Sequence, residues 1–173
     1  YCTLFNGGKF LEPTLLKQVK SNDKVIYTDN PTTSNVFREG TCDLINGCLM
    51  QTVSDGTAKA LCEKGFDLCA KTGTNGNEKG NVDAYAIAYT SEHLFAIWAG
   101  NENNSLMPNN VTGSFLASEL GCVIDEFYLN FKPKQLKYSN DVTRVKLCKL
   151  AYEQGKLLLA DEMQVRMGGF KEV

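Results

Sequence analysis

The sequence has a single histidine, His93, and no two cysteines in the C-x-x-C spacing. A zinc ribbon needs closely spaced cysteine or histidine ligands, so these two shortages argue against such a site. Seven cysteines are nevertheless present, most of them beside apolar neighbours: Cys2, Cys42, Cys48, Cys62, Cys69, Cys122 and Cys148. We interpret them as free structural thiols, buried like small hydrophobic side chains. Because their number is odd, they cannot all pair in disulfides within the chain.

Long apolar runs and clusters of basic residues are also missing. A formal net charge of −2 over 173 residues, without a segment dense in lysine and arginine, argues against a nucleic-acid partner. No apolar segment is long enough to cross a bilayer, and no signal sequence is visible. The sequence opens with Tyr1 in what reads as the end of a helix, so we expect a piece of a longer protein. These shortages therefore say nothing about where that longer protein resides.

What is present suits one ordinary globular domain, whose elements follow from hydrophobic periodicity and turn residues. The chain should open with a helical turn over 1–5, ended by Asn6-Gly7-Gly8, and continue with a hairpin of 10–19 and 25–27 that has Pro13 in an edge strand. A helix over 36–53 and strands over 67–74, 83–90 and 94–101 should follow. The last element expected is a helix over 114–130 with Ser114 as N-cap. The predicted fold class is α+β, an antiparallel sheet covered by helices in an α/β/α-type sandwich.

The strand predicted over 83–90 alternates between small and large side chains. One face carries Ala84, Ala86 and Ala88, and the other carries Tyr85, Ile87 and Tyr89. A face of small residues permits close helix packing, and we expect the helix over 114–130 to cover it with Leu116, Leu120, Val123, Ile124, Phe127 and Phe131. The strand over 94–101 is apolar on both faces, as in a covered central strand. His93, in the turn before it, is expected to be solvated.

The character of the chain changes after residue 131. Residues 143–147 alternate, and a second short apolar segment follows at 156–160. We therefore assign 1–131 to one domain and 132–173 to a linker with a small strand hairpin, with the start of a following domain as one reading of that hairpin.

Lys71-Thr72-Gly73-Thr74 ends one of the predicted strands. A cation, two hydroxyls and a glycine at a strand end form a compact device for binding a carboxylate and an oxyanion. The plain alternative is a solvated lysine among threonines, which are common in strands because they are β-branched. A K-T-G tripeptide alone is weak evidence, so its context decides.

That context is a series of motifs: N-G-G at 6–8, K-F-L-E-P at 9–13, V-I-Y at 25–27, G-T-A at 56–58, A-K-T-G-T at 70–74, D-A-Y-A-I-A-Y-T at 83–90 and L-F-A-I-W-A-G-N at 94–101. From residue 1 to about 130, the series resembles the C-terminal half of the transpeptidase domain of class A penicillin-binding proteins. Segment 144–161 is similar to the strand-rich link after that domain in some Gram-positive members. The resemblance implies part of the fold shared by penicillin-binding proteins and serine β-lactamases, in a membrane-anchored, extracytoplasmic bacterial parent that builds peptidoglycan.

The reaction of that family is acyl transfer through a serine ester. By the resemblance, Lys71 gives the cleft its positive potential, and Thr72 and Thr74 bind the terminal carboxylate of a D-Ala-D-Ala stem peptide or of a β-lactam. The backbone N–H of Thr74 is expected to be an oxyanion donor, and Gly73 leaves room for a substrate added as an antiparallel strand. Lys71 and Thr74 are thus the expected catalytic residues, and 71–74 the expected substrate-binding residues. The resemblance implies no metal or cofactor.

Two other motifs of the family do not stand in this sequence. No serine begins a Ser-x-Asn motif, and the one Ser-x-x-Lys pattern, Ser21 to Lys24, falls in the predicted hairpin turn. The family's nucleophile heads a buried helix, where the lysine one turn later meets it, so we reject Ser21. Members of such a catalytic unit act together, and we therefore expect this chain alone to be inactive.

Two principal readings remain open. The first is a fragment of a D,D-transpeptidase that carries the K-T-G wall, and the second is a non-catalytic binding or assembly module that retains the fold. A serine β-lactamase is a third reading, disfavoured because the trailing hairpin resembles a transpeptidase. Without the strands of the other half-domain, the strand over 94–101 would leave a bare apolar edge. We expect residues 142–150, a second copy or a partner fragment to cover it.

Overall fold

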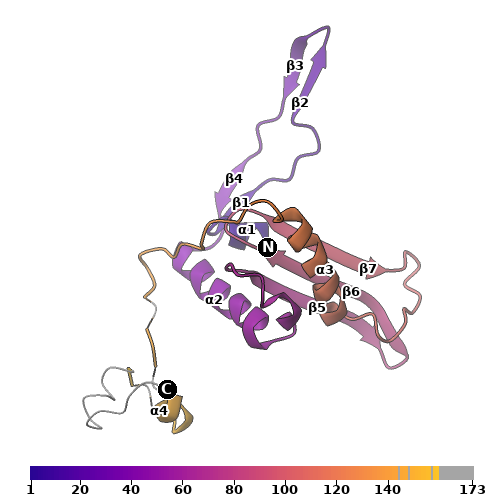
Figure 1. Ribbon diagram of the computed structural model, residues 1–173. Coiled ribbons are helices and arrows are strands. Elements are labelled where there is room, and N and C mark those ends of the chain that lie inside the picture. The colour runs from indigo at the N-terminus through magenta and orange to yellow at the C-terminus, as the bar shows by residue number, and fades with distance from the viewer. Residues whose placement is uncertain (144, 148, 157, 160–173) are drawn as a thin grey trace. The chain divides into compact units, whose positions relative to one another are not determined.

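The computed structural model of the protein describes residues 1–143, 145–147, 149–156 and 158–159 (Figure 1). It contains two compact units, Tyr1–Asp141 and Val142–Val173. The division of the chain at 131/132 stays a prediction. Among the described residues, none of the helices is long and apolar enough to cross a membrane.

The chain opens with helix α1 (Cys2–Phe5), and the predicted stop at Asn6-Gly7-Gly8 is confirmed. Gly7 and Gly8 have φ angles of +65° and +93°, which glycine adopts without steric cost. A Cβ on Gly8 would lie 2.2 Å from the carbonyl oxygen of Phe37, so this position also needs a residue without a side chain. The turn thereby brings β1 beside the segment that precedes α2.

Two short strand pairs follow, in place of the single hairpin expected from 10–19 and 25–27. Strand β1 (Lys9–Leu11) pairs with β4 (Thr33–Asn35), whereas β2 (Gln18–Ser21) pairs with β3 (Lys24–Thr28). The prediction of an edge-strand proline was wrong: β1 ends at Leu11, and Pro13 lies between strands because it has no N–H to donate.

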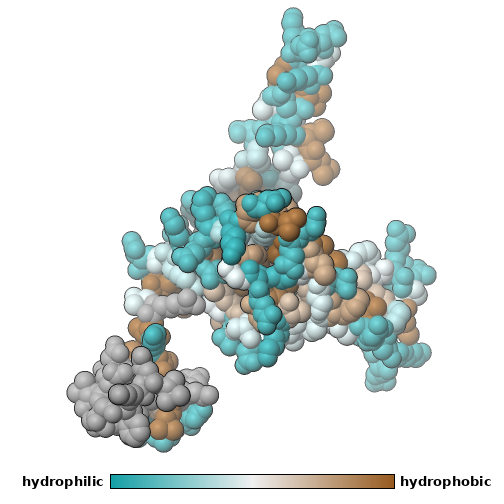
Figure 2. Space-filling view, viewed as in Figure 1, coloured by the Kyte–Doolittle hydropathy of each residue, from teal (hydrophilic) through white to brown (hydrophobic). Residues whose placement is uncertain are grey.

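The β2–β3 hairpin itself is confirmed and forms an arm that projects from the rest of the first unit (Figure 1). Its turn residues Asn22 and Asp23 have positive φ angles of 47° and 63°, the geometry of a tight two-residue hairpin turn. Apolar side chains such as Ile26, 65% exposed, lie on the surface of the arm (Figure 2).

Helix α2 (Glu39–Asp55) starts three residues after the predicted start at 36 and ends two residues after the predicted end at 53. Its chain turns back at Gly56, where the amides of Gly56 and Ala58 both donate to the carbonyl of Thr52. A Cβ on Gly56 would lie 2.7 Å from the Thr52 Cα, so glycine is required for this turn. A short 3-10 helix η1 (Lys59–Leu61) follows and leads to the central sheet.

The central sheet has the order β5-β6-β7 and is antiparallel throughout. Its strands are β5 (Cys69–Asn77), β6 (Gly80–Tyr89) and β7 (Leu94–Gly100), which confirms the three predicted strands. Strands β5 and β6 run further than predicted, because they join in a second hairpin near Asn77 and Gly80. Among the described residues β7 pairs with β6 alone, so β7 is an edge strand of this sheet. Its apolar sequence predicted a central strand, but the central strand is β6.

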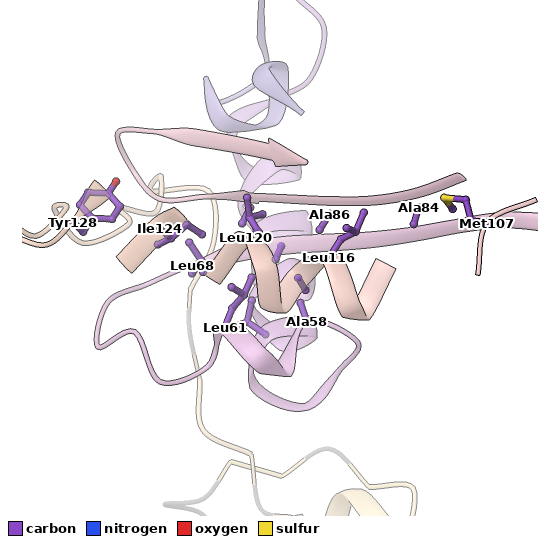
Figure 3. Close-up of a cluster of buried hydrophobic side chains, with 14 residues drawn as sticks. Ala58, Leu61, Leu68, Ala84, Ala86, Met107, Leu116, Leu120, Ile124 and Tyr128 are labelled. Carbon is purple, nitrogen blue, oxygen red and sulfur yellow. The ribbon is translucent and has the colours of Figure 1, made fainter. Parts of the chain in front are cut away.

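Helix α3 (Gly113–Phe127) covers one face of this sheet. Thr112 is its N-cap, since its hydroxyl oxygen accepts a hydrogen bond from the amide of Phe115; the prediction of Ser114 was wrong by two residues. Leu116, Leu120 and Ile124 are buried against the alanine face of β6, as predicted (Figure 3). Val123 and Phe127, which were also expected on this face, are more than 40% exposed, whereas Ala117 is fully buried in the same cluster.

The second unit contains a short helix, α4 (Lys149–Glu153), in the region between the two segments of the predicted hairpin. An isolated antiparallel bridge joins Leu147 to Leu159. Arg144, Leu157 and Ala160, which belong to the predicted strands over 143–147 and 156–160, lie outside the described residues.

Candidate substrate-binding site

The four predicted site residues lie on β5, and the strand register divides them between the two faces of the sheet. Thr72 and Thr74 stand opposite Ala86 and Ala84 of β6, so their side chains lie on the face that α3 covers. Lys71 and Gly73 stand opposite Ile87 and Tyr85 and belong to the other face. The two threonine hydroxyls and the lysine ammonium group therefore lie on opposite faces of one strand.

Lys71 is exposed, and its ammonium group donates to the carbonyl oxygen of Thr72 at 2.5 Å. The carbonyl keeps the ammonium close to the strand. A single exposed cation in this position makes the surface along the strand attractive to anions.

Thr72 has a different environment, because it is only 8% exposed. Its hydroxyl oxygen lies 2.6 Å from the hydroxyl oxygen of Thr57, which is itself exposed at the end of the α2 turn. Thr57 belongs to the family marker G-T-A at 56–58, but its sequence pattern predicted no site role for it. Its position two residues before η1, just after the helix that packs on β5, was the only signal available.

Thr74 is exposed, and its hydroxyl oxygen accepts a hydrogen bond of 2.9 Å from the backbone N–H of Gly113. Since the oxygen is the acceptor in this bond, the hydroxyl hydrogen stays free to donate elsewhere. The predicted role of the Thr74 backbone N–H as an oxyanion donor stays a prediction.

Gly113 is a second residue that sequence reasoning missed. It is the first residue of α3, and a Cβ built on it would lie 2.7 Å from the carbonyl oxygen and 2.8 Å from the nitrogen of Gly73. The start of α3 therefore rests directly on the K-T-G strand, and only glycine permits this approach. A glycine directly before the predicted cap Ser114, in a polar loop, gave no sequence signal for the contact.

The turn that carries Thr57 is attached to β5 and to the core. The Thr52 hydroxyl of α2 donates to the carbonyl of Ala70, one residue before the K-T-G strand segment. Ala58, next to Thr57, is fully buried in the cluster that also holds Leu61 and Ala70. Buried contacts on both sides of the turn thus hold the Thr57 hydroxyl in place beside Thr72.

The rejected Ser-x-x-Lys pattern lies where the sequence predicted, in the β2–β3 hairpin. Ser21 is the last residue of β2 and is paired in register with Lys24, the first residue of β3. Both residues are exposed, and neither belongs to a helix.

The prediction for His93 was wrong. Its ring is half-buried, with Nδ1 lying 2.9 Å from the hydroxyl oxygen of Tyr128, and it packs edge-on against Phe127. The Tyr128 hydroxyl also lies 2.8 Å from that of Thr90, in the same turn as His93. Aromatic side chains at the end of α3 reach this turn, an arrangement that the turn's polar sequence did not indicate.

The cysteines differ from the prediction in burial. Cys42 and Cys69 are buried, whereas the other described free thiols are exposed: Cys2, Cys48, Cys62 and Cys122. All six are free, and no group of three metal-ligating side chains occurs in the described part of the chain.

Comparison with known proteins identifies the family. Residues 1–111 match the family described as the penicillin binding protein transpeptidase domain. The chain belongs to this family. The match includes β5 and its K-T-G residues, and it ends just before Gly113, the first residue of α3.

Individual relatives agree with the family. Penicillin-binding protein 1A/1B of Bacillus subtilis is 26% identical over 115 residues, which cover 60% of this chain and 13% of that protein. The chain thus spans about an eighth of the length of this curated relative.

Solved structures of penicillin-binding proteins share the fold. Penicillin-binding protein 1A of Haemophilus influenzae has a TM-score of 0.71 at 14% identity, covering 87% of this chain and 28% of that one. The PonA1 protein of Mycobacterium tuberculosis in complex with penicillin V has a TM-score of 0.63 at 22% identity, covering 80% of this chain and 40% of that one. The α+β fold class of the transpeptidase domain is therefore confirmed.

Proposed function

We propose that this chain forms the K-T-G wall of a peptidoglycan D,D-transpeptidase. The observation that carries the proposal is the position of Lys71, Thr72, Gly73 and Thr74 on β5 of a sheet with the fold of penicillin-binding proteins. Lys71 supplies positive charge on one face of the strand, and hydroxyl groups lie on the other. A substrate that ends in a carboxylate meets both when it lies along the strand.

In the proposed reaction a serine oxygen attacks the carbonyl carbon of the peptide bond between the two D-alanines of a stem peptide. The bond to the terminal D-alanine breaks, and that residue leaves with a proton on its amine. The amine of a second stem peptide then attacks the serine ester, forms the cross-link and returns the proton to the serine. Thr74 contributes its backbone N–H to the oxyanion, and Lys71 and Thr74 act during the chemical steps.

The serine of this reaction lies, in our proposal, on a segment of the transpeptidase domain outside this sequence. The proposal is supported by the one Ser-x-x-Lys pattern of the sequence, Ser21 to Lys24, which lies exposed in the β2–β3 hairpin and not at the start of a buried helix. Within the described ranges β7 pairs on one side, and we propose that this segment or another chain adds its strands on the other side, because an apolar edge strand favours pairing. The parent is proposed to work outside the cytoplasmic membrane, which anchors it.

β-Lactams are proposed as ligands of the completed site. A relative with this fold has been solved in complex with penicillin V. The carboxylate of a penicillin offers the same group to the hydroxyls of β5 as the stem peptide does, so one wall can serve both ligands.

Intact-mass spectrometry after incubation with benzylpenicillin tests the assignment. We expect no covalent adduct on this chain, and a stoichiometric, hydroxylamine-labile adduct on a longer chain that includes the upstream serine motifs. Ser21→Ala in the longer chain is the matched control and should leave the adduct intact. A labile adduct on the short chain that disappears in the Ser21→Ala variant would show that the nucleophile is Ser21.

The same experiment separates the alternative of a non-catalytic module. That alternative is favoured by the lack of a Ser-x-Asn motif among the serines of this sequence. If the longer chain also carries no serine that benzylpenicillin acylates, the K-T-G wall has a binding role and the transpeptidase proposal fails.

A further inference from the structure

We propose that residues 132–139 form a detachable strap, which can leave the first unit while the helices and the sheet of that unit stay folded. The strap is an extended segment that follows α3 and precedes the second unit. In Figure 1 it passes α1 and the start of α2. Its release uncovers the apolar cluster at the start of β5.

Carboxylates of the first unit hold the strap by its backbone. Three amides of the strap each donate to one carboxylate: Lys134 to Glu92 at 3.0 Å, Leu136 to Asp67 at 3.2 Å and Ser139 to Asp43 at 2.8 Å. These carboxylates come from the turn between β6 and β7, the segment before β5 and helix α2. The strap therefore crosses three elements that are separate in the sequence, and its groove recognises an extended main chain.

The side chains of the strap add charge complementarity. Residues 132–139 contain three lysines and no acidic residue, whereas the groups that accept their amides are carboxylates. Lys134 forms an ion pair with Glu92 at 2.6 Å, and the second oxygen of that carboxylate accepts the Lys134 amide. The Ser91 hydroxyl, in the same turn, donates to the Lys134 carbonyl at 2.6 Å. The groove thus suits an extended basic segment, which the strap supplies.

The strap has few of the contacts that would make it part of the core. Pro133 is the one buried residue among 132–139, and Leu136 is only half-buried. These residues belong to no helix or strand, so their departure breaks no ladder of the sheet. Segments with few buried apolar contacts and exposed hydrogen bonds open locally, at a lower free energy than global unfolding.

The underside of the strap is incompletely packed. A pocket of about 360 Å³ lies between residues 134–137 and a wall that includes Leu4 and Phe5 of α1 and Asn46 of α2. Atoms that line such a space lack the dispersion contacts that close packing supplies. Polar contacts carry most of the attachment, and water can replace them when the strap leaves.

Release of the strap affects the start of β5. Leu136 packs against the buried cluster that contains Cys69, and Asp67, which accepts the Leu136 amide, precedes Cys69 by two residues. When the strap leaves, Leu136 leaves the cluster and the Cys69 thiol becomes easier to reach. Because the second unit begins at Val142, a partner that pulls on that unit acts on the strap through the chain.

Native-state hydrogen exchange, followed by NMR on the 173-residue chain, tests the strap. The amides of Lys134, Leu136 and Ser139 should exchange at least about a hundredfold faster than those of the central strand β6. Low urea should barely change their rates, because local opening exposes little surface. Equal rates and equal urea dependence in strap and strand would overturn the proposal, as would strap amides that exchange like those of an unstructured peptide.

Substitution of one carboxylate separates the strap from the fold. Asp67→Ala removes the acceptor of the Leu136 amide and should speed strap exchange about tenfold further, with a smaller change in β6. Asp67→Asn keeps an oxygen acceptor without the charge and should lie between Asp67→Ala and the wild type. Glu63→Ala removes an exposed carboxylate from the same segment and should behave like the wild type. If Asp67→Ala speeds β6 as much as the strap, Asp67 holds the whole fold and the proposal fails.

A pulse of iodoacetamide, read by mass spectrometry, tests the uncovering of β5. The variant is Glu92→Ala, which removes the acceptor of the Lys134 amide. Labelling of Cys69 should rise in step with exchange of the Leu136 amide, whereas the exposed Cys122 should be labelled equally in variant and wild type. A strap that opens without any rise at Cys69 would contradict this consequence of release.

Discussion

The two faces of the central sheet are covered to different extents. On one face α3 packs along the alanines of β6, and Ile124 of that helix is fully buried. In the described part of the chain, the opposite face is covered at one end, where Cys69 and Tyr89 pack against α1 and α2. Further along it, Tyr85 and Trp98 are 43% and 50% exposed. The K-T-G strand takes its stability from the first face and presents Lys71 on the second.

This difference shows how one strand can be both rigid and accessible. Small side chains on β6 let α3 come close enough to bury its leucines, so the position of β5 is set by packing on that face. The second face keeps aromatic side chains at the surface, where another protein segment can bury them.

The largest loss of stability is expected for Ile124→Ala, which tests the covered face. The substitution removes a fully buried side chain and leaves a cavity between α3 and β6, so the free energy of unfolding should fall by roughly 2–5 kcal/mol. Urea unfolding followed by circular dichroism measures the change. Val123→Ala, in the exposed position one residue earlier, is the matched control and should cost much less. Equal losses in the two variants would contradict the assignment of the covered face.

A pH series tests the covered end of the second face. Burial is the main cause that raises the pKa of the Cys69 thiol to about 12, and burial also raises the pKa of the neighbouring Tyr89. The unfolded chain loses the thiol proton near pH 9, before the folded chain does. Stability is therefore complete below pH 9 and should fall above it, by up to about 1.4 kcal/mol per pH unit.

Urea unfolding at pH 8 and pH 10 measures this loss. Cys69→Ala should show a smaller loss than the wild type, whereas Cys122→Ala, which removes an exposed thiol, should behave like the wild type. An equal loss of stability in all three proteins would show that burial does not oppose ionisation of the Cys69 thiol.

The smallest effect is expected for Trp98→Ala, on the open part of the second face. Half of the Trp98 side chain is already exposed, and its indole N–H donates to Asp83 at the surface, so the cost should be about 1 kcal/mol or less. The same urea assay measures it, with Ile124→Ala as the reference. A cost as large as that of Ile124→Ala would mean that another part of the protein covers Trp98.

Much of the sheet could be predicted because its signals are local. The alternation of alanines with larger residues along β6 gave both its strand character and the face that α3 covers. The predictions were wrong where the structure depends on contacts between residues far apart in the sequence. Phe10 was assigned to the hairpin arm, but β1 pairs with β4, whose polar residues Thr33–Asn35 carry no strand pattern. Similarly, Thr112 caps α3 in place of Ser114, because the contact of Gly113 with the K-T-G strand sets where the helix begins.

The candidate site divides in the same way. The sequence alone determined that Lys71, Thr72, Gly73 and Thr74 lie on one strand and belong to the transpeptidase family, since motif order and β periodicity are properties of the chain. Only the tertiary structure decided what each hydroxyl meets. Thr57 reaches Thr72 across 15 residues, and the amide of Gly113 reaches Thr74 across 39. Such contacts depend on how helices pack against the sheet, which local sequence does not encode.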